Sequence, residues 1–92
     1  QRCVVGKGVV LNCNTTISHD SVIGDFSFFG PAVTLSGFVK IGKETFLGSG
    51  SVIIDNVSIV NQVKIGAGAV VSKNINEVGL YLGIPAKKST NK

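Results

Sequence analysis

Residues 17–48 read ISHDSVIGDFSFFGPAVTLSGFVKIGKETFLG. Within them an aliphatic or aromatic residue recurs at every sixth position. The same spacing continues in both directions without a slip, and it yields twelve consecutive six-residue repeats between Val5 and Val71. Fixed short repeats are typical of solenoids, in which each repeat packs only against its neighbours. The repeat positions are Val5, Leu11, Ile17, Ile23, Phe29, Leu35, Ile41, Leu47, Ile53, Ile59, Ile65 and Val71.

A period of six fits neither an α-helix nor a hairpin sheet, but it fits a short strand followed by a corner. Three such repeats would close one triangular coil, and twelve repeats would give about four coils stacked at about 4.8 Å. The aliphatic residue and the residue four positions later are expected to point inward. The residue directly after the aliphatic is usually small, often glycine, and we expect it to allow the corner to bend.

Length and composition limit the class of protein. At 92 residues the chain is expected to hold one domain. Its hydrophobic content of 43% with only 15% charged residues excludes a disordered tail. No apolar run is long enough for a membrane helix. We expect a repeat domain over 1–78 and a C-terminal extension over 79–92. The missing initiator Met indicates a piece of a longer protein.

Cysteine usage and charge indicate the setting. Cys3 and Cys13 form neither a disulfide framework nor a C-x-x-C motif, which favours a reduced, cytoplasmic location. Five of the nine basic residues lie from Lys64 onward, where Glu77 is the only acid, so this end should attract a polyanion. Neither an RNA-binding motif nor a basic helix accompanies them, so nucleic acid is not an expected partner.

The uninterrupted repeats, followed by Gly83-Ile84-Pro85-Ala86-Lys87, resemble the hexapeptide-repeat acyltransferases. The resemblance implies an all-β, left-handed parallel β-helix, a homotrimer and acetyl-CoA as co-substrate. Residues 17–48 resemble one branch more closely, the sialic acid O-acetyltransferase and UDP-amino-sugar N-acetyltransferase (NeuD) family. Its members carry a nucleotide-sugar-binding βαβ domain ahead of the β-helix, and no stretch of this chain matches that domain. The identity of the acceptor therefore stays open.

The resemblance implies a catalytic role for three residues. His19 is the only histidine, and histidine is the residue type best suited to act as a general base near neutral pH. Asp20 would orient His19, although neighbouring strand residues point to opposite faces, so the pair needs a bent backbone. Gly37 follows His19 by eighteen residues, one coil on, and its N–H would stabilise an oxyanion. Each residue also has an interpretation without a catalytic role. His19 would be an exposed or structural histidine, Asp20 a solvated charge at a corner, and Gly37 a glycine that only allows the corner to bend.

The resemblance also implies four cofactor-binding residues. Ser49 and Ala67 match positions whose backbones contact acetyl-CoA, and Phe28 matches a position where similar proteins can carry a second histidine. Lys87 would meet the phosphates of the coenzyme, unless it belongs to a solvated tail. The alternative for Phe28 is packing at a subunit contact, together with Phe26, Phe29 and Phe38.

These observations predict an acetyltransferase that moves acetyl from acetyl-CoA to an amino or hydroxyl group of a sugar or nucleotide-sugar. His19 would be the general base, and each site would lie between subunits of a homotrimer. The alternative is a non-catalytic β-helical module for trimerisation. The γ-type carbonic anhydrases share the fold, but their zinc needs three histidines and this chain has one, so no metal is expected.

Overall fold

The computed structural model describes residues 2–89 and consists of short strands joined by tight turns. Twelve strands of two residues follow the six-residue period, and two more close the C-terminal end. The strands are β1 Val4–Val5, β2 Val10–Leu11, β3 Thr16–Ile17, β4 Val22–Ile23, β5 Phe28–Phe29, β6 Thr34–Leu35, β7 Lys40–Ile41, β8 Phe46–Leu47, β9 Val52–Ile53, β10 Ser58–Ile59, β11 Lys64–Ile65, β12 Val70–Val71, β13 Leu80–Leu82 and β14 Lys87–Lys88.

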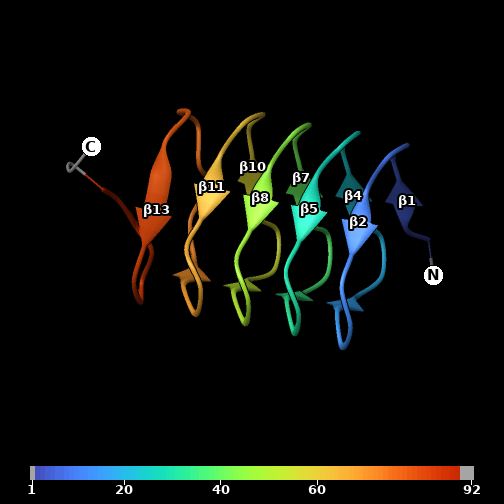
Figure 1. Cartoon of the computed structure of the whole chain (residues 1–92), viewed down its shortest axis with the longest axis horizontal. Coiled ribbons are helices and arrows are strands. Elements are labelled where there is room, and N and C mark those ends of the chain that lie inside the picture. Colours follow the sequence, from blue (N-terminus) through green and yellow to red (C-terminus); the bar gives the residue numbers. More distant parts are fainter. Residues whose placement is uncertain (1, 90–92) are drawn as a thin grey trace.

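Among β1–β12 every third strand belongs to the same sheet, so three sheets of parallel repeat strands form the sides of a triangular prism. The first sheet has the order β1-β4-β7-β10, the second β14-β13-β11-β8-β5-β2 and the third β12-β9-β6-β3. Paired residues within the repeats differ by eighteen positions, as in Val22↔Lys40 and Phe28↔Phe46. Figure 1 shows the coils side by side along the long axis of a body of 37 × 23 × 21 Å. The predicted left-handed parallel β-helix is confirmed.

The core is the ladder of repeat residues that the sequence places inside the prism. The side chains of Phe29, Leu35, Leu47, Ile53 and Ile65 are completely buried. The first coil differs, because Val5 and Leu11 occupy the same inward positions yet remain 45% and 41% exposed. No described coil covers that end of the prism, so the first coil stays partly exposed.

Three corners join the sheets, and each is named after the type of a residue that lies on it. The histidine corner (residues 19–20, 37–38 and 55–56) joins the third sheet to the first, and the lysine corner (7–8, 25–26, 43–44 and 61–62) joins the first to the second. The serine corner (13–14, 31–32, 49–50 and 67–68) joins the second sheet to the third. Each corner therefore lies opposite one sheet, and the histidine corner lies opposite the second.

The bend itself does not come from the small residues that follow the aliphatic positions. The second residue of each corner pair has a φ between 53° and 71°, and most of these residues are not glycine. Glycine after the aliphatic position has another function, since a β-carbon on Gly42 would lie 2.5 Å from the backbone N of Asn61. At Gly48 the corresponding distance to the N of Ala67 is 2.7 Å. These glycines allow successive coils to approach closely.

The C-terminal residues remain attached to the prism. β13 pairs in parallel with β11, and β14 pairs with β13 in the antiparallel direction. Tyr81 is buried next to the core, and its hydroxyl donates to the Glu77 carbonyl at 3.0 Å. Residues 79–89 of the extension expected over 79–92 thus add two strands to the second sheet, and 90–92 lie outside the described residues.

Candidate functional site

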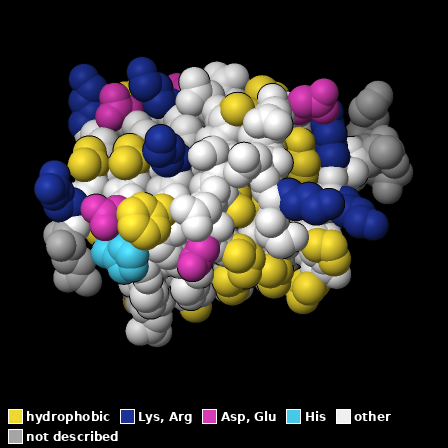
Figure 2. Space-filling view, turned by 180° about the vertical axis from the view of Figure 1, so that it is seen from behind, with side chains coloured by type: hydrophobic (Ala, Val, Ile, Leu, Met, Phe, Trp, Pro, Cys, Tyr) yellow, Lys and Arg dark blue, Asp and Glu magenta, His cyan; other side chains and the backbone are white. Residues whose placement is uncertain are grey.

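The only histidine lies on the surface of the histidine corner, near the N-terminal end of the prism. Figure 2 shows it beside acidic and hydrophobic side chains. Half of the His19 side chain is exposed, and so is 44% of the Asp20 side chain. Ligands in solution can therefore reach the imidazole.

Asp20 turns back toward the residue before it. Its φ of 59° places it in the left-handed region, and this bend brings its carboxylate to the same side of the chain as the imidazole. The Nδ1 of His19 donates to Oδ2 of Asp20 at 3.3 Å. That hydrogen bond leaves the lone pair on Nε2, the nitrogen that can accept a proton from a substrate. The required bend of the backbone is thus present.

Gly37 lies one coil on from His19 and directly beneath the ring. A β-carbon on Gly37 would lie 2.9 Å from Cε1 and 3.0 Å from Nε2 of His19, closer than side-chain atoms pack. The residue is buried, and its carbonyl accepts from Asn56 N–H at 3.0 Å. Glycine is therefore the residue that lets the imidazole rest on the backbone at this point.

The N–H of Gly37 has no hydrogen-bond acceptor among the described residues. At the lysine corner, two of the four equivalent N–H groups are capped by a side chain one coil on. Lys7 N–H donates to Asp25 at 3.0 Å, and Lys43 N–H donates to Asn61 at 2.8 Å. Asp55 holds the corresponding place one coil on from Gly37 but makes no such bond. The Gly37 N–H can therefore donate to a ligand.

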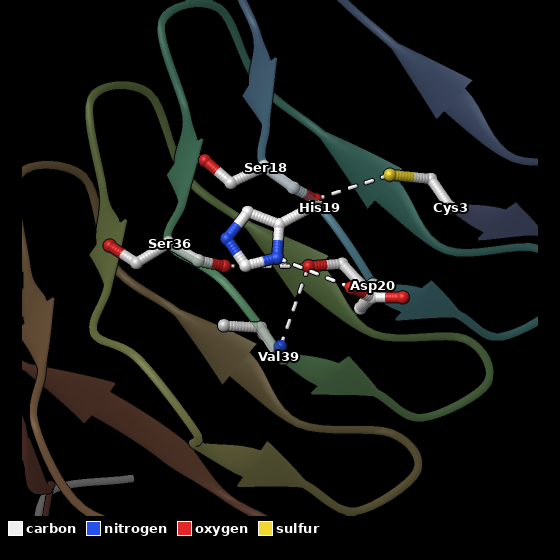
Figure 3. A network of polar contacts seen from close by, with 7 residues as sticks. Cys3, Ser18, His19, Asp20, Ser36 and Val39 are labelled. Carbon is white, nitrogen blue, oxygen red and sulfur yellow. Dashed lines mark hydrogen bonds and ion pairs between the residues drawn. The ribbon is translucent and has the colours of Figure 1, made fainter. Parts of the chain in front are cut away.

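A buried hydroxyl links the two turns of the histidine corner, and Figure 3 labels its two partners, Ser36 and Val39. Ser21 follows Asp20 and is 1% exposed. Its Oγ donates to the Ser36 carbonyl and accepts from Val39 N–H, both at 3.4 Å. Ser36 and Val39 flank the turn that contains Gly37, so this contact connects the His19 turn to the next one.

Sequence reasoning missed a further neighbour of the histidine. The rings of Phe38 and His19 lie 5.0 Å apart between centroids, at an interplanar angle of 85°. The Phe38 N–H donates to the His19 carbonyl at 3.1 Å. The signal for this contact was available, because Phe38 follows Asp20 by one coil of eighteen residues.

The structure does not bring the four cofactor candidates to His19. Phe28 lies on the outer face of the second sheet, stacked on Phe46 with centroids 5.4 Å apart. Ser49 and Ala67 lie at the serine corner, along one edge of that sheet, and Lys87 lies in β14 at its C-terminal end. All four thus follow the second sheet, which lies opposite the histidine corner of the same chain.

Within one chain, Phe28 does not cluster with Phe26, Phe29 and Phe38, the residues named in the alternative of packing at a subunit contact. Phe29 is completely buried in the core, because it occupies an inward repeat position. Phe26 lies at the lysine corner and Phe38 at the histidine corner. Phe28 lies on a sheet face, in register with Phe46 and Lys64, and not on an edge of the prism.

The serine corner has an open outer surface. Gly50 and Gly68 adopt φ values of 71°, and a β-carbon on either would meet no atom within 4 Å. Small residues at positions 49 and 67 precede them. Lys64 and Lys87 lie on the second sheet, next to this corner. Lys88 also belongs to that sheet, but it forms an ion pair with Glu77 at 3.2 Å. An elongated anionic ligand would therefore meet small residues first and lysines toward the C-terminal end.

Several features are absent from residues 2–89. They enclose no pocket, so any ligand site of one chain is an open surface. They contain no group of three His, Cys, Asp or Glu residues that could hold a metal ion. No helix capable of crossing a membrane occurs in this range.

Comparison with known proteins supports the fold and its family resemblance. The family described as bacterial transferase hexapeptide (six repeats) matches residues 38–73. The acetyltransferase domain of PglB from Neisseria gonorrhoeae FA1090, in complex with acetyl coenzyme A, is 31% identical with a TM-score of 0.86. The match covers 95% of this chain and 45% of that one. No curated protein sequence matches the chain.

Two further solved structures are similar. One is a histidine-to-asparagine variant of perosamine N-acetyltransferase from Caulobacter crescentus, in complex with CoA and GDP-perosamine. It is 31% identical with a TM-score of 0.80, over 97% of this chain and 51% of that one. The other is a serine acetyltransferase in complex with CoA, 26% identical with a TM-score of 0.87, over 95% of this chain and 39% of that one. The chain thus spans about half of these structures or less, and its resemblance to the hexapeptide-repeat acyltransferases is confirmed.

Proposed function

We propose that this chain, a left-handed β-helix that resembles the hexapeptide-repeat acyltransferases, transfers acetyl from acetyl-CoA to an amino or hydroxyl group of a sugar or nucleotide-sugar. The observation that carries the proposal is the arrangement of His19, Asp20 and Gly37 on one exposed corner. It combines a proton acceptor, a carboxylate that orients it and an N–H without an acceptor. Acyl transfer from a thioester uses a general base and an oxyanion donor, and the carboxylate orients the base.

His19 is the general base in this proposal. Asp20 accepts from Nδ1–H, and Nε2 takes the proton of the attacking amine or hydroxyl as the new bond to the carbonyl carbon forms. The Gly37 N–H donates to the oxyanion of the tetrahedral intermediate. When the C–S bond breaks, the imidazolium returns its proton to the thiolate of CoA. No covalent bond to the enzyme is needed.

The outer surface along the second sheet fits acetyl-CoA. Ser49 and Ala67 leave room for a narrow chain next to the open positions Gly50 and Gly68. Phe28 supplies an apolar surface, 39% exposed. Lys87, which is exposed and in no ion pair among the described residues, would meet a phosphate. The neighbours crystallised with CoA or acetyl coenzyme A support this co-substrate.

The proposed site needs two copies of the chain. The histidine corner and the second sheet lie on opposite sides of one triangular prism. The two surfaces of one chain therefore cannot contact the same thioester. A heterologous contact that closes after three copies would set the histidine corner of one copy against the second sheet of the next. We therefore propose a homotrimer with three sites between subunits. The reaction requires no metal.

A nucleotide-linked amino sugar is the acceptor to test first. The solved perosamine N-acetyltransferase complex contains GDP-perosamine, and this supports an acceptor of that class. The serine acetyltransferase likeness makes serine the natural comparison substrate. Nitrogen and oxygen acceptors use the same proton transfer to His19, so the choice between them needs measurement.

Titration calorimetry with acetyl-CoA, combined with the mass of the assembly, tests the function. We expect saturable binding to a trimer, retained binding by His19→Ala, and acetylation of an amino-sugar nucleotide by the parent only. Failure of a folded trimer to bind acetyl-CoA would contradict the proposal and leave a non-catalytic trimerisation module.

Mixed assemblies test whether the site is shared. In His19→Ala the base is lost, and in Ala67→Trp a bulky ring blocks the proposed groove. Trimers formed from both variants should regain about a quarter of the parent activity, because about one interface in four then joins an intact His19 to an intact groove. If the mixture stays as inactive as each variant alone, the two groups of residues do not form one site.

A further inference from the structure

We propose that Phe38 is a positioning residue that holds the His19 imidazole with Nε2 over Gly37. The inference rests on the proposed function for its catalytic consequence, but the contact itself can be measured without any activity. The sequence suggested for Phe38 only a packing role at a subunit contact, as an alternative.

Three contacts surround the imidazole on the histidine corner. Asp20 accepts from Nδ1, and the Cα of Gly37 lies under Cε1 and Nε2. The Phe38 ring meets the imidazole at 85°, the edge-to-face arrangement that aromatic pairs favour. Without Phe38, only a hydrogen bond of 3.3 Å between half-exposed groups and the contact with Gly37 would hold the ring. Phe38 therefore supplies the contact that restricts rotation away from Gly37.

The backbone of Phe38 suits this role as well. Its N–H donates to the His19 carbonyl, which sets the separation of the two residues. Its φ of 60° directs the side chain outward from the corner, and the ring remains 52% exposed. The side chain is thus left at the surface, where its ring contacts the imidazole.

Phe26 provides a matched control on the same scaffold. It occupies the equivalent position of the lysine corner, with a φ of 61° and 58% of its side chain exposed. Its ring lies over Gly8 and makes no ring contact with the histidine. Alanine is tolerated at this position of a corner, since Ala32 has a φ of 61°. Phe26→Ala and Phe38→Ala thus differ mainly in the loss of the His19 contact.

The first measurement is the NMR spectrum of the imidazole. With one histidine in the chain, Hε1 and Hδ2 of His19 give a single pair of signals. In Phe38→Ala both signals should move toward their positions in an unstructured peptide, because the ring current of Phe38 is lost. Phe26→Ala should leave them in place. Unchanged signals in a folded Phe38→Ala variant would overturn the proposal.

The second measurement is the kinetic consequence. Phe38→Ala should lower kcat by about tenfold, the upper range expected when one aromatic contact is lost, and leave the KM for acetyl-CoA unchanged. Phe38→Tyr keeps the ring and should restore kcat, and Phe26→Ala should match the parent. An active Phe38→Ala enzyme with parental kcat would overturn the positioning role. A parent without acetyltransferase activity would refute the proposed function, and the spectrum alone would then decide the orientation of the imidazole.

Discussion

The His19 imidazole rests on the α-carbon of Gly37, where an added β-carbon would lie 2.9 Å from Cε1 of the ring. The two residues are eighteen positions apart and meet because successive coils stack in register. This contact brings the proposed base and the proposed oxyanion donor together, and it makes the absence of a side chain at position 37 a requirement of the site.

Gly37→Ala should therefore reduce activity without unfolding the chain. The new methyl group would push the half-exposed imidazole outward, because an exposed ring gives way more easily than the backbone. We expect kcat to fall by at least about tenfold, with an unchanged melting profile. In the His19→Ala background the same change should have no further effect. An additive loss in the double variant would show that Gly37 acts independently of the imidazole.

His19→Ala should lower kcat to a small residual rate and leave acetyl-CoA binding intact. Removal of a general base typically costs about 10²–10⁴-fold in rate. Binding should persist because the proposed cofactor residues follow the second sheet, on the other side of the prism. Rates from acceptor acetylation and dissociation constants from calorimetry check the two parts. Loss of binding in this variant would place the coenzyme against the histidine itself.

Asp20→Asn should have a much smaller effect than His19→Ala. The pair is half exposed and 3.3 Å apart, and exposed ion pairs contribute about 0–1 kcal/mol, which corresponds to about fivefold or less in kcat. The kcat of the two variants, measured with the same acceptor, gives the comparison. Equal losses would mean that Asp20 takes part in the chemistry directly.

Lys87→Ala should raise the KM for acetyl-CoA by up to about fivefold at low salt, and the difference should disappear as salt is added. Lys88→Ala is the matched control. Lys88 neighbours Lys87 in β14, but it is paired with Glu77 at 3.2 Å. Steady-state kinetics over a range of salt concentrations test both variants. An equal increase in KM for both would indicate a general effect of charge instead of a phosphate contact.

The first coil should contribute less to stability than the central ones. Leu35→Ala removes a completely buried side chain and should cost about 2–5 kcal/mol in the free energy of unfolding. Leu11→Ala changes the same repeat position where 41% of the side chain is exposed, and should cost clearly less. Denaturant unfolding compares the two. A similar cost for both would show that another copy or segment covers the first coil in solution.

The sequence by itself determined the solenoid. A residue pattern of period six can bury one side of each short strand only if the chain turns after every repeat, and this sets both the strands and the spacing of eighteen between stacked residues. The inward ladder from Ile23 to Val71 and the stacking of His19 on Gly37 follow from counting alone. The handedness came from the family resemblance, because the period does not specify it.

The tertiary structure decided how side chains use those positions. The left-handed φ of Asp20 brings its carboxylate within hydrogen-bond distance of His19, and the Phe38 ring contacts the imidazole edge-to-face. The same structure separates Phe28, Ser49, Ala67 and Lys87 from the histidine corner. Counting residues gives the position of each Cα along a coil, but the direction of a side chain depends on φ at the corner and on the atoms packed against it. Those quantities exist only once the coils have stacked.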